Sequence, residues 1–176
     1  MMDSPFIIPE PGPDHPANWY RRCLEYPEHV HLKDGEPHMA FLLRTDPLFE
    51  SDRRILGAVH LPRVQGKLNR VFLWMVERMF GAMPDFLVVL DGEYWTAADD
   101  RHREILIFHE LSHCVHATDG DGEPRYDDET GRPIWKLTGH SVEEFTSVVR
   151  RYGAWNDELR EFVGAAGVRV DRGQGR

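Results

Sequence analysis

The sequence His109-Glu110-Leu111-Ser112-His113 decides how this chain is read. On an α-helix, residues four apart differ by about 40° and by roughly 6 Å along the axis, so His109 and His113 lie on one face and both imidazoles can reach one metal ion. Glu110 lies about 100° further round, which places it beside a water held by the metal rather than among the ligands. The pentapeptide therefore predicts a helix that carries a zinc site suited to hydrolysis.

The residues around the pentapeptide predict the extent of this helix. Thr96-Ala97-Ala98-Asp99 has the pattern of a capping box, which predicts a helix start near residue 97. Residues 105–108 are apolar, Leu111 and Val115 follow, and Gly120 is the expected end. The helix is thus expected to be apolar nearly all round and to cross the core. Two imidazoles and a carboxylate are costly to bury there unless a metal ion satisfies them.

The remaining pattern predicts an α+β fold. Residues 38–45 and 54–61 are short apolar runs separated by a polar turn at 46–52, which predicts an antiparallel pair of strands. Residues 67–80 have helical spacing, with methionines expected to fill the core, and 85–90 reads as a buried strand. We expect a minimal-zincin-like domain in which a small, mainly antiparallel sheet packs on the zinc-binding core helix.

The chain of 176 residues is expected to form one main domain between two tails. Residues 1–14 contain four prolines and predict an extended arm, and 164–176, rich in glycine and arginine, predict a flexible tail. The domain then spans 15–163, with a polar insert at 118–139.

Charge and composition limit the partners. The net charge of -9 argues against nucleic acid, because an acidic protein repels phosphate. No apolar run approaches the roughly 18 residues of a membrane span, so no membrane partner is expected. The N-terminus lacks the basic and apolar regions of a signal peptide, which predicts a cytoplasmic protein. Cys23 and Cys114 are too few for a disulfide framework, and Cys114 is expected to be a packed thiol.

A catalytic zinc ion needs a third protein ligand and an open position for water. His116 is seven residues beyond the first histidine, about 10 Å along a helix, and one ion cannot bridge that distance. His140 stands immediately before the next predicted helix, on a segment that must fold back, and is the preferred ligand. Glu144 and Glu143 remain as alternatives, although a second capping box starting at Ser141 assigns Glu144 to a backbone amide.

Several stretches together resemble the phage metallopeptidase family, which is in turn similar to SprT-like and other minimal zinc metallopeptidases. They are residues 85–90, Trp95, 103–106, 109–113 and 139–145, within roughly 38–152. The resemblance implies that His140 is the third zinc ligand, with Phe145 packing behind it. The long polar insert departs from the SprT-like pattern, and no nucleic-acid-binding module is visible, so a role in DNA repair does not carry over.

The sequence is therefore interpreted as a zinc-dependent metallopeptidase that cleaves a peptide or protein, in the bacterial host cytoplasm if the chain is phage-derived. Glu110 would activate the water on Zn²⁺ held by His109, His113 and His140. Substrate would add as a strand along an exposed sheet edge.

Three further side chains are candidates to stabilise the oxyanion: Tyr126, Arg132 and Tyr152. Two other functions remain open. One is a non-catalytic, zinc-stabilised binding module, in which Cys114 or Glu144 would complete a closed site. The other is a zinc hydrolase that acts on a non-peptide amide.

Overall fold

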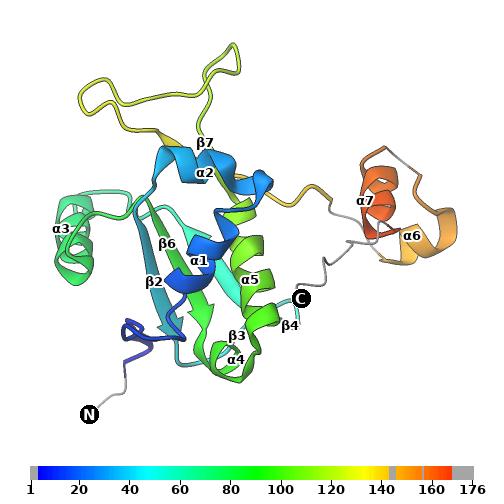
Figure 1. Ribbon diagram of the computed structural model, residues 1–176, viewed down its shortest axis with the longest axis horizontal. Coiled ribbons are helices and arrows are strands. Elements are labelled where there is room, and N and C mark those ends of the chain that lie inside the picture. Colours follow the sequence, from blue (N-terminus) through cyan, green and yellow to red (C-terminus); the bar gives the residue numbers. More distant parts are fainter. Residues whose placement is uncertain (1–3, 143–145, 156, 168–176) are drawn as a thin grey trace, which may run out of the picture. The chain divides into compact units, whose positions relative to one another are not determined.

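The computed structural model describes residues 4–142, 146–155 and 157–167. The chain divides into two compact units, Met1–Thr138 and Gly139–Arg176. Both helices and strands are present, which confirms the α+β class (Figure 1). In chain order the elements are β1 (Phe6–Ile7), α1 (Ala17–Cys23), the 3-10 helix η1 (Pro27–His29), α2 (Val30–Gly35), β2 (Met39–Arg44), β3 (Leu48–Glu50), β4 (Arg53–Ile55), β5 (Gly57–His60), α3 (Asn69–Phe80), β6 (Phe86–Asp91), α4 (Gly92–Ala97), α5 (Asp100–Ser112), β7 (Cys114–His116), β8 (Trp135–Leu137), α6 (Thr146–Tyr152) and α7 (Asp157–Gly167).

The main sheet has the strand order β1-β2-β6-β5. The outer pairs β1–β2 and β5–β6 are antiparallel, and the inner pair β2–β6 is parallel, so the sheet is mainly antiparallel as expected. The predicted pairing of residues 38–45 with 54–61 is wrong, because β6 lies between β2 and β5. β6 is a continuous apolar run whose Phe86, Val88 and Leu90 are fully buried, and such a strand belongs in the centre of a sheet.

The polar stretch 46–52 is more than a turn. It contains β3, which pairs with β4 in a separate two-stranded hairpin. Ser51 and Asp52 form the tip with φ of 47° and 63°, a backbone conformation that Asp tolerates better than most residues. The run predicted as one strand at 54–61 is therefore divided into β4 and β5.

The helix that carries the pentapeptide is α5, and it starts later than predicted. Asp99 is its N-cap and accepts a hydrogen bond from the amide of His102 at 2.8 Å. Thr96 instead donates its hydroxyl to the carbonyl of Gly92 inside α4. The expected capping box is thus wrong. Thr96 belongs to the short helix α4, and Asp99, predicted to be the third helical residue after a cap at Thr96, is itself the N-cap of α5.

α5 also ends earlier than predicted, at Ser112 rather than near Gly120. Residues 114–116 leave the helix to form β7, which pairs with β8 in the register Cys114↔Leu137 to His116↔Trp135. The backbone amides of β7 thereby find partners in a strand that lies some twenty residues further along the chain. No pattern among neighbouring residues predicts the pairing of β7 with β8.

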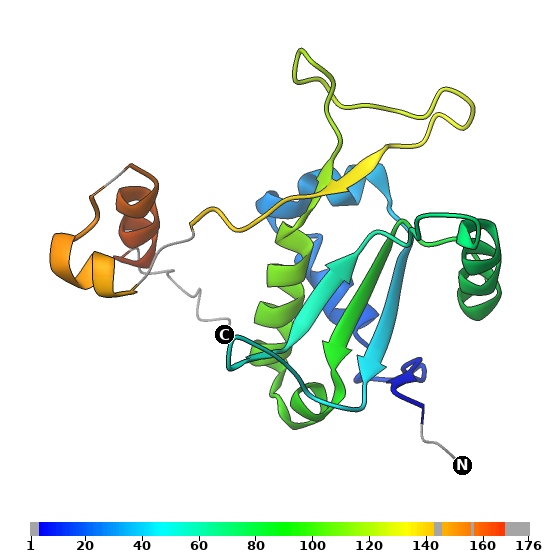
Figure 2. The same cartoon turned by 180° about the vertical axis from the view of Figure 1, so that it is seen from behind.

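α5 and α1 pack together on one face of the main sheet, and α3 stands to the side of the sheet, next to β2 (Figures 1 and 2). The buried face of α5 includes Leu106, Ile107 and Leu111, whereas Ile105 is 53% exposed. α5 is therefore apolar on one face and not, as the sequence had predicted, nearly all round. The core between α5 and the sheet is formed by Trp19, Cys23, Leu32, Phe41, Val59, Phe86, Val88, Leu90, Trp95, Leu106, Ile107, Leu111, Cys114 and Trp135.

The second unit contains α6 and α7. Gly153, with φ of 70°, follows α6, and α7 extends to Gly167, so the first residues of the stretch 164–176 are helical. Glu143, Glu144 and Phe145 lie outside the described residues. In the part of the chain that the structure describes, no helix is long and apolar enough to cross a bilayer.

Candidate metal centre

The two histidines of the pentapeptide stand at the end of α5. His109 is in the last turn, and His113 is the C-cap residue, with φ -78° and ψ -18°. Their ring centroids are 5.1 Å apart and the ring planes are inclined by 82°. Because the C-cap residue keeps helical dihedral angles, the i, i+4 relationship holds although the helix ends there.

His113 is held by the residue that follows β8. Its Nδ1 lies 2.7 Å from the carbonyl oxygen of Thr138, and the amide of Thr138 donates to the carbonyl of His113 at 2.8 Å. A carbonyl only accepts, so Nδ1 carries the proton and Nε2 presents its lone pair. This pair of hydrogen bonds also brings the chain back beside the end of α5, two residues before His140.

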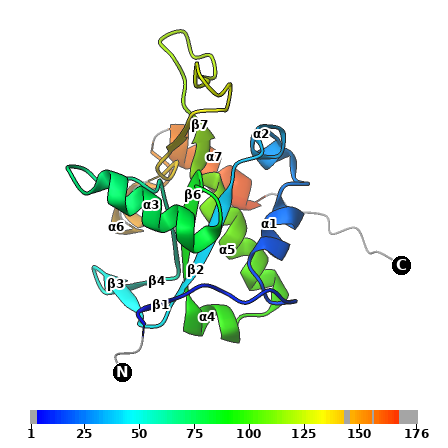
Figure 3. The same cartoon turned by 90° about the vertical axis from the view of Figure 1, so that its left-hand side faces the viewer.

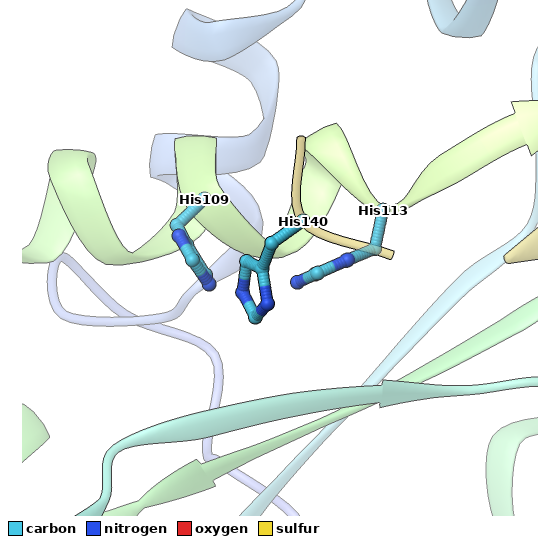
Figure 4. Close-up of side chains that lie close together, drawn as sticks. All are labelled: His109, His113 and His140. Carbon is cyan, nitrogen blue, oxygen red and sulfur yellow. The ribbon is translucent and has the colours of Figure 1, made fainter. Parts of the chain in front are cut away.

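His140 completes a group of three histidines. One ring nitrogen from each of His109, His113 and His140 lies within 4.8 Å of the others, and the rings turn toward one another (Figure 4). Nitrogen ligands of one zinc ion lie about 2.0–2.1 Å from it, so the three nitrogens would have to draw closer together to share a single ion. Three neutral imidazoles fit a transition metal, and they leave a coordination position for a further ligand.

Glu110 faces away from solvent, against β5. It is 3% exposed, and a methyl group added to Gly57 would lie 2.5 Å from its Oε1. Burial raises the pKa of Glu110 to about 7. The carboxyl group next to the histidines is thus one that takes up and releases a proton near neutral pH.

The three histidines and the neighbouring carboxyl group prompt a comparison with known families. The family model described as "Putative phage metallopeptidase" matches residues 16–166. The chain belongs to this family. Comparisons with curated proteins and with solved structures give no match. Membership in a metallopeptidase family implies a metal cofactor and a peptide or protein substrate, and the three histidines of this family member are a group able to hold a metal.

The other residues considered as ligands lie elsewhere in this member of the family. His116 is in β7 rather than on the helix, where its ring packs edge-on against Trp135 at 4.4 Å between centroids. Cys114 is fully buried, and burial, with a contribution from Glu110, raises the pKa of its thiol to about 12. Such a thiol is a packing group, as the sequence predicts.

The three candidates for oxyanion stabilisation belong to different segments of the chain. Arg132 donates to Asp85 Oδ2 at 2.6 Å, and Tyr126 lies with its ring centroid 6.2 Å from that of His116. Tyr152 belongs to α6 in the second unit.

Two residues that contact His113 and Glu110 were not identified from the sequence. Thr138 orients His113, and no sequence signal identifies a backbone carbonyl in this role. Gly57 does leave a signal, because a glycine inside an apolar strand pattern often marks the close approach of another group.

Proposed function

We propose that this chain is a zinc-dependent peptidase in which His109, His113 and His140 hold the ion and Glu110 is the general base. The observation that carries the proposal is the convergence of three imidazole nitrogens within 4.8 Å at the end of the helix that also carries a buried carboxyl group. When bound, the ion would lower the pKa of a water molecule toward about 7 and polarise the scissile carbonyl.

Glu110 would take the proton from the attacking water and later deliver it to the leaving amine. This relay needs a group whose pKa lies near the working pH. Burial raises the pKa of Glu110 to about 7, which supports the assignment. The contact with Gly57 limits the positions open to the carboxyl group, so the proton acceptor is held in place by β5.

The edge strand β5 is the proposed substrate platform. It pairs with β6 on one side and is the last strand of the sheet on the other. Its first residue is Gly57, which lies against Glu110, so a peptide added alongside β5 would pass the proposed base. Pairing through backbone groups gives affinity with little demand on side-chain sequence.

The experiment is a combined measurement of metal content and peptide cleavage. We expect purified protein to contain one zinc per chain and to digest casein or a peptide library, with loss of activity on chelation and recovery on adding zinc. Glu110→Gln should keep the zinc and lose about 100-fold to 10,000-fold in activity, since glutamine preserves the volume but cannot carry the proton.

The outcomes separate the proposal from its alternatives. Zinc binding with no cleavage by the wild type, even of a peptide library, would indicate a zinc-stabilised binding module. Cleavage of small amides but not of peptides would indicate a different hydrolase. Full activity of Glu110→Gln would remove Glu110 from its role, and protein that cannot be loaded with a transition metal would overturn the whole proposal.

A further inference from the structure

Helix α3 exposes a row of large apolar side chains. Leu68, Val71, Met75 and Met79 recur at intervals of three and four residues and so lie on one face, with Trp74 beside them. They are 69%, 52%, 50%, 49% and 56% exposed, respectively. The methionines predicted to fill the core are therefore at the surface, and that prediction is wrong. We call these five residues the α3 ridge.

The ridge faces away from the rest of its unit. Val76, about 100° round the helix from Met75, is 5% exposed and is the buried residue by which the helix is anchored. α3 stands beside the sheet, apart from α1 and α5 (Figures 1 and 3). An apolar face of this kind on a surface helix is a mark of an interaction site rather than of a core.

The ridge is bordered by positive charge. Residues 63–80 contain Arg63, Lys67, Arg70 and Arg78, all exposed, against the single acidic residue Glu77, so this segment has a net charge of +3 in a chain of net charge -9. The Arg78 guanidinium lies over the Trp74 ring, 5.8 Å from its centroid. The charge of the segment is thus opposite to that of the protein as a whole, which points to an anionic partner.

We propose that the α3 ridge binds an anionic lipid surface, with α3 lying in the plane of the interface. A helix with tryptophan and long apolar side chains on one face and lysine and arginine beside them has the chemistry of such interfacial helices. The net negative charge of the chain does not prevent this contact, because at physiological salt charges are screened beyond about 8 Å. The sequence alone predicted no membrane partner, since it excludes only a spanning segment and does not show that the ridge is exposed.

A protein partner fits the ridge less well. Five half-exposed side chains on a convex helix offer on the order of 500 Å², whereas a stable protein interface needs about 800 Å² from each partner. A second copy docked ridge to ridge would also bring Arg70 and Arg78 of one chain near the basic residues of the other, which is unfavourable. A lipid surface needs no complementary shape and supplies negative charge.

The test is co-sedimentation of the full chain with vesicles of phosphatidylcholine alone or mixed with phosphatidylglycerol. We expect binding to the anionic vesicles only, with a blue shift of tryptophan fluorescence that is lost in Trp74→Phe. The double variant Lys67→Glu/Arg70→Glu should bind at least tenfold more weakly, since each basic residue contributes roughly fivefold. Raising the salt to about 0.5 M should also weaken binding.

Phe49→Ser is the matched control, because Phe49 in β3 is 58% exposed, much like Trp74, but lies outside the segment. It should bind as the wild type does, and all variants are compared by circular dichroism and melting temperature. No binding, or equal binding to neutral vesicles, would overturn the proposal. A concentration-dependent dimer that Met75→Glu abolishes, without vesicle binding, would instead assign the ridge to a second copy. None of these readouts depends on peptidase activity.

Discussion

Gly57 in β5 lies so close to Glu110 in α5 that a methyl group on its Cα would be 2.5 Å from Oε1 and 2.9 Å from Cδ of the carboxyl group. Real Cβ atoms do not approach other atoms this closely, so any larger residue must displace the glutamate or separate the strand from the helix. The two residues are joined by the packing of an edge strand on the helix that carries the histidines. Gly57 thus sets the position of the proposed base without contacting the ion.

The first prediction follows from this contact. Gly57→Ala should lower peptidase activity by at least tenfold, because the added methyl group pushes the carboxyl group from its place, while the three histidines and zinc content remain unchanged. Activity and metal content of the same preparation measure both effects. Gly12→Ala is the control, since a Cβ there meets nothing within 4 Å. If Gly57→Ala were fully active, the position of Glu110 would not depend on β5.

A second prediction concerns Arg103 in α5, which contacts the segment before α1, α1 itself and α4. Its guanidinium donates to the carbonyls of Trp95 at 2.9 Å and Thr96 at 3.3 Å and to Asp14 at 2.5 Å. It also lies 5.2 Å from the Trp19 ring centroid. Asp14 precedes α1, whose cap position is Pro16, and its carboxylate accepts from Arg103.

Arg103→Met should therefore lower the free energy of unfolding by about 2–3 kcal/mol, because buried carbonyls lose their donor. Denaturant unfolding measures the change. Arg101→Met removes the same charge from an exposed position of α5 and should have an effect below about 0.5 kcal/mol. Equal effects of the two substitutions would mean that net charge, and not the contacts of Arg103, sets the stability.

The sequence predicted the features that depend on neighbouring residues. The i, i+4 histidines, the helix at 69–80 and the strand at 86–91 follow from local periodicity, and the structure contains these elements close to the expected bounds. The ends of α5 were misplaced for a physical reason. Asp99 fits the sequence pattern of two positions: the third helical residue after a cap at Thr96, or the N-cap itself. Because Thr96 lies in the short helix α4, Asp99 is the N-cap of α5.

Features that depend on distant residues were not predictable. The parallel pairing of β2 with β6, the contact between Gly57 and Glu110, and the hydrogen bonds between His113 and Thr138 join segments far apart in the chain. The α3 ridge shows a second limit of prediction from the sequence. Its apolar periodicity predicts a helix, but periodicity does not tell which face the rest of the molecule covers.

A third prediction concerns Asp91 at the end of β6. Its carboxylate is 1% exposed, accepts two hydrogen bonds from Arg54 at 2.8 and 2.6 Å, and caps α4 by accepting from the amide of Tyr94 at 3.0 Å. We expect Asp91→Asn to lower the free energy of unfolding at neutral pH by about 1–3 kcal/mol, because Arg54 then keeps only its exposed partner Glu93 and loses the charge-assisted hydrogen bonds to the buried carboxylate. Denaturant unfolding is the measurement.

The same carboxylate should make stability depend on pH. Hydrogen bonds from Arg54 lower the pKa of Asp91 below its ordinary value of 3.8. Its contribution is therefore present above about pH 4 and is lost as the pH falls through the lowered folded-state pKa. The difference in unfolding free energy between wild type and Asp91→Asn should shrink below pH 4, measured with chelator present so that loss of metal does not contribute. A difference that stays constant down to pH 2 would contradict this.

The last prediction distinguishes the candidates for the third ligand. His140→Ala should weaken zinc affinity by at least 100-fold, because it removes one of three converging nitrogens, and it should also speed hydrogen exchange in residues 118–140, whose end the ion would hold. His116→Ala loses packing against Trp135, so it should lower the melting temperature with little change in zinc affinity. Glu144→Gln should lower the free energy of unfolding by on the order of 1 kcal/mol through the loss of a capping interaction, and the protein should still bind zinc. Competition with a chromogenic chelator measures affinity for all three. A large loss of affinity confined to Glu144→Gln would replace His140 by a carboxylate, and a large loss in His116→Ala would require β7 to contribute a ligand.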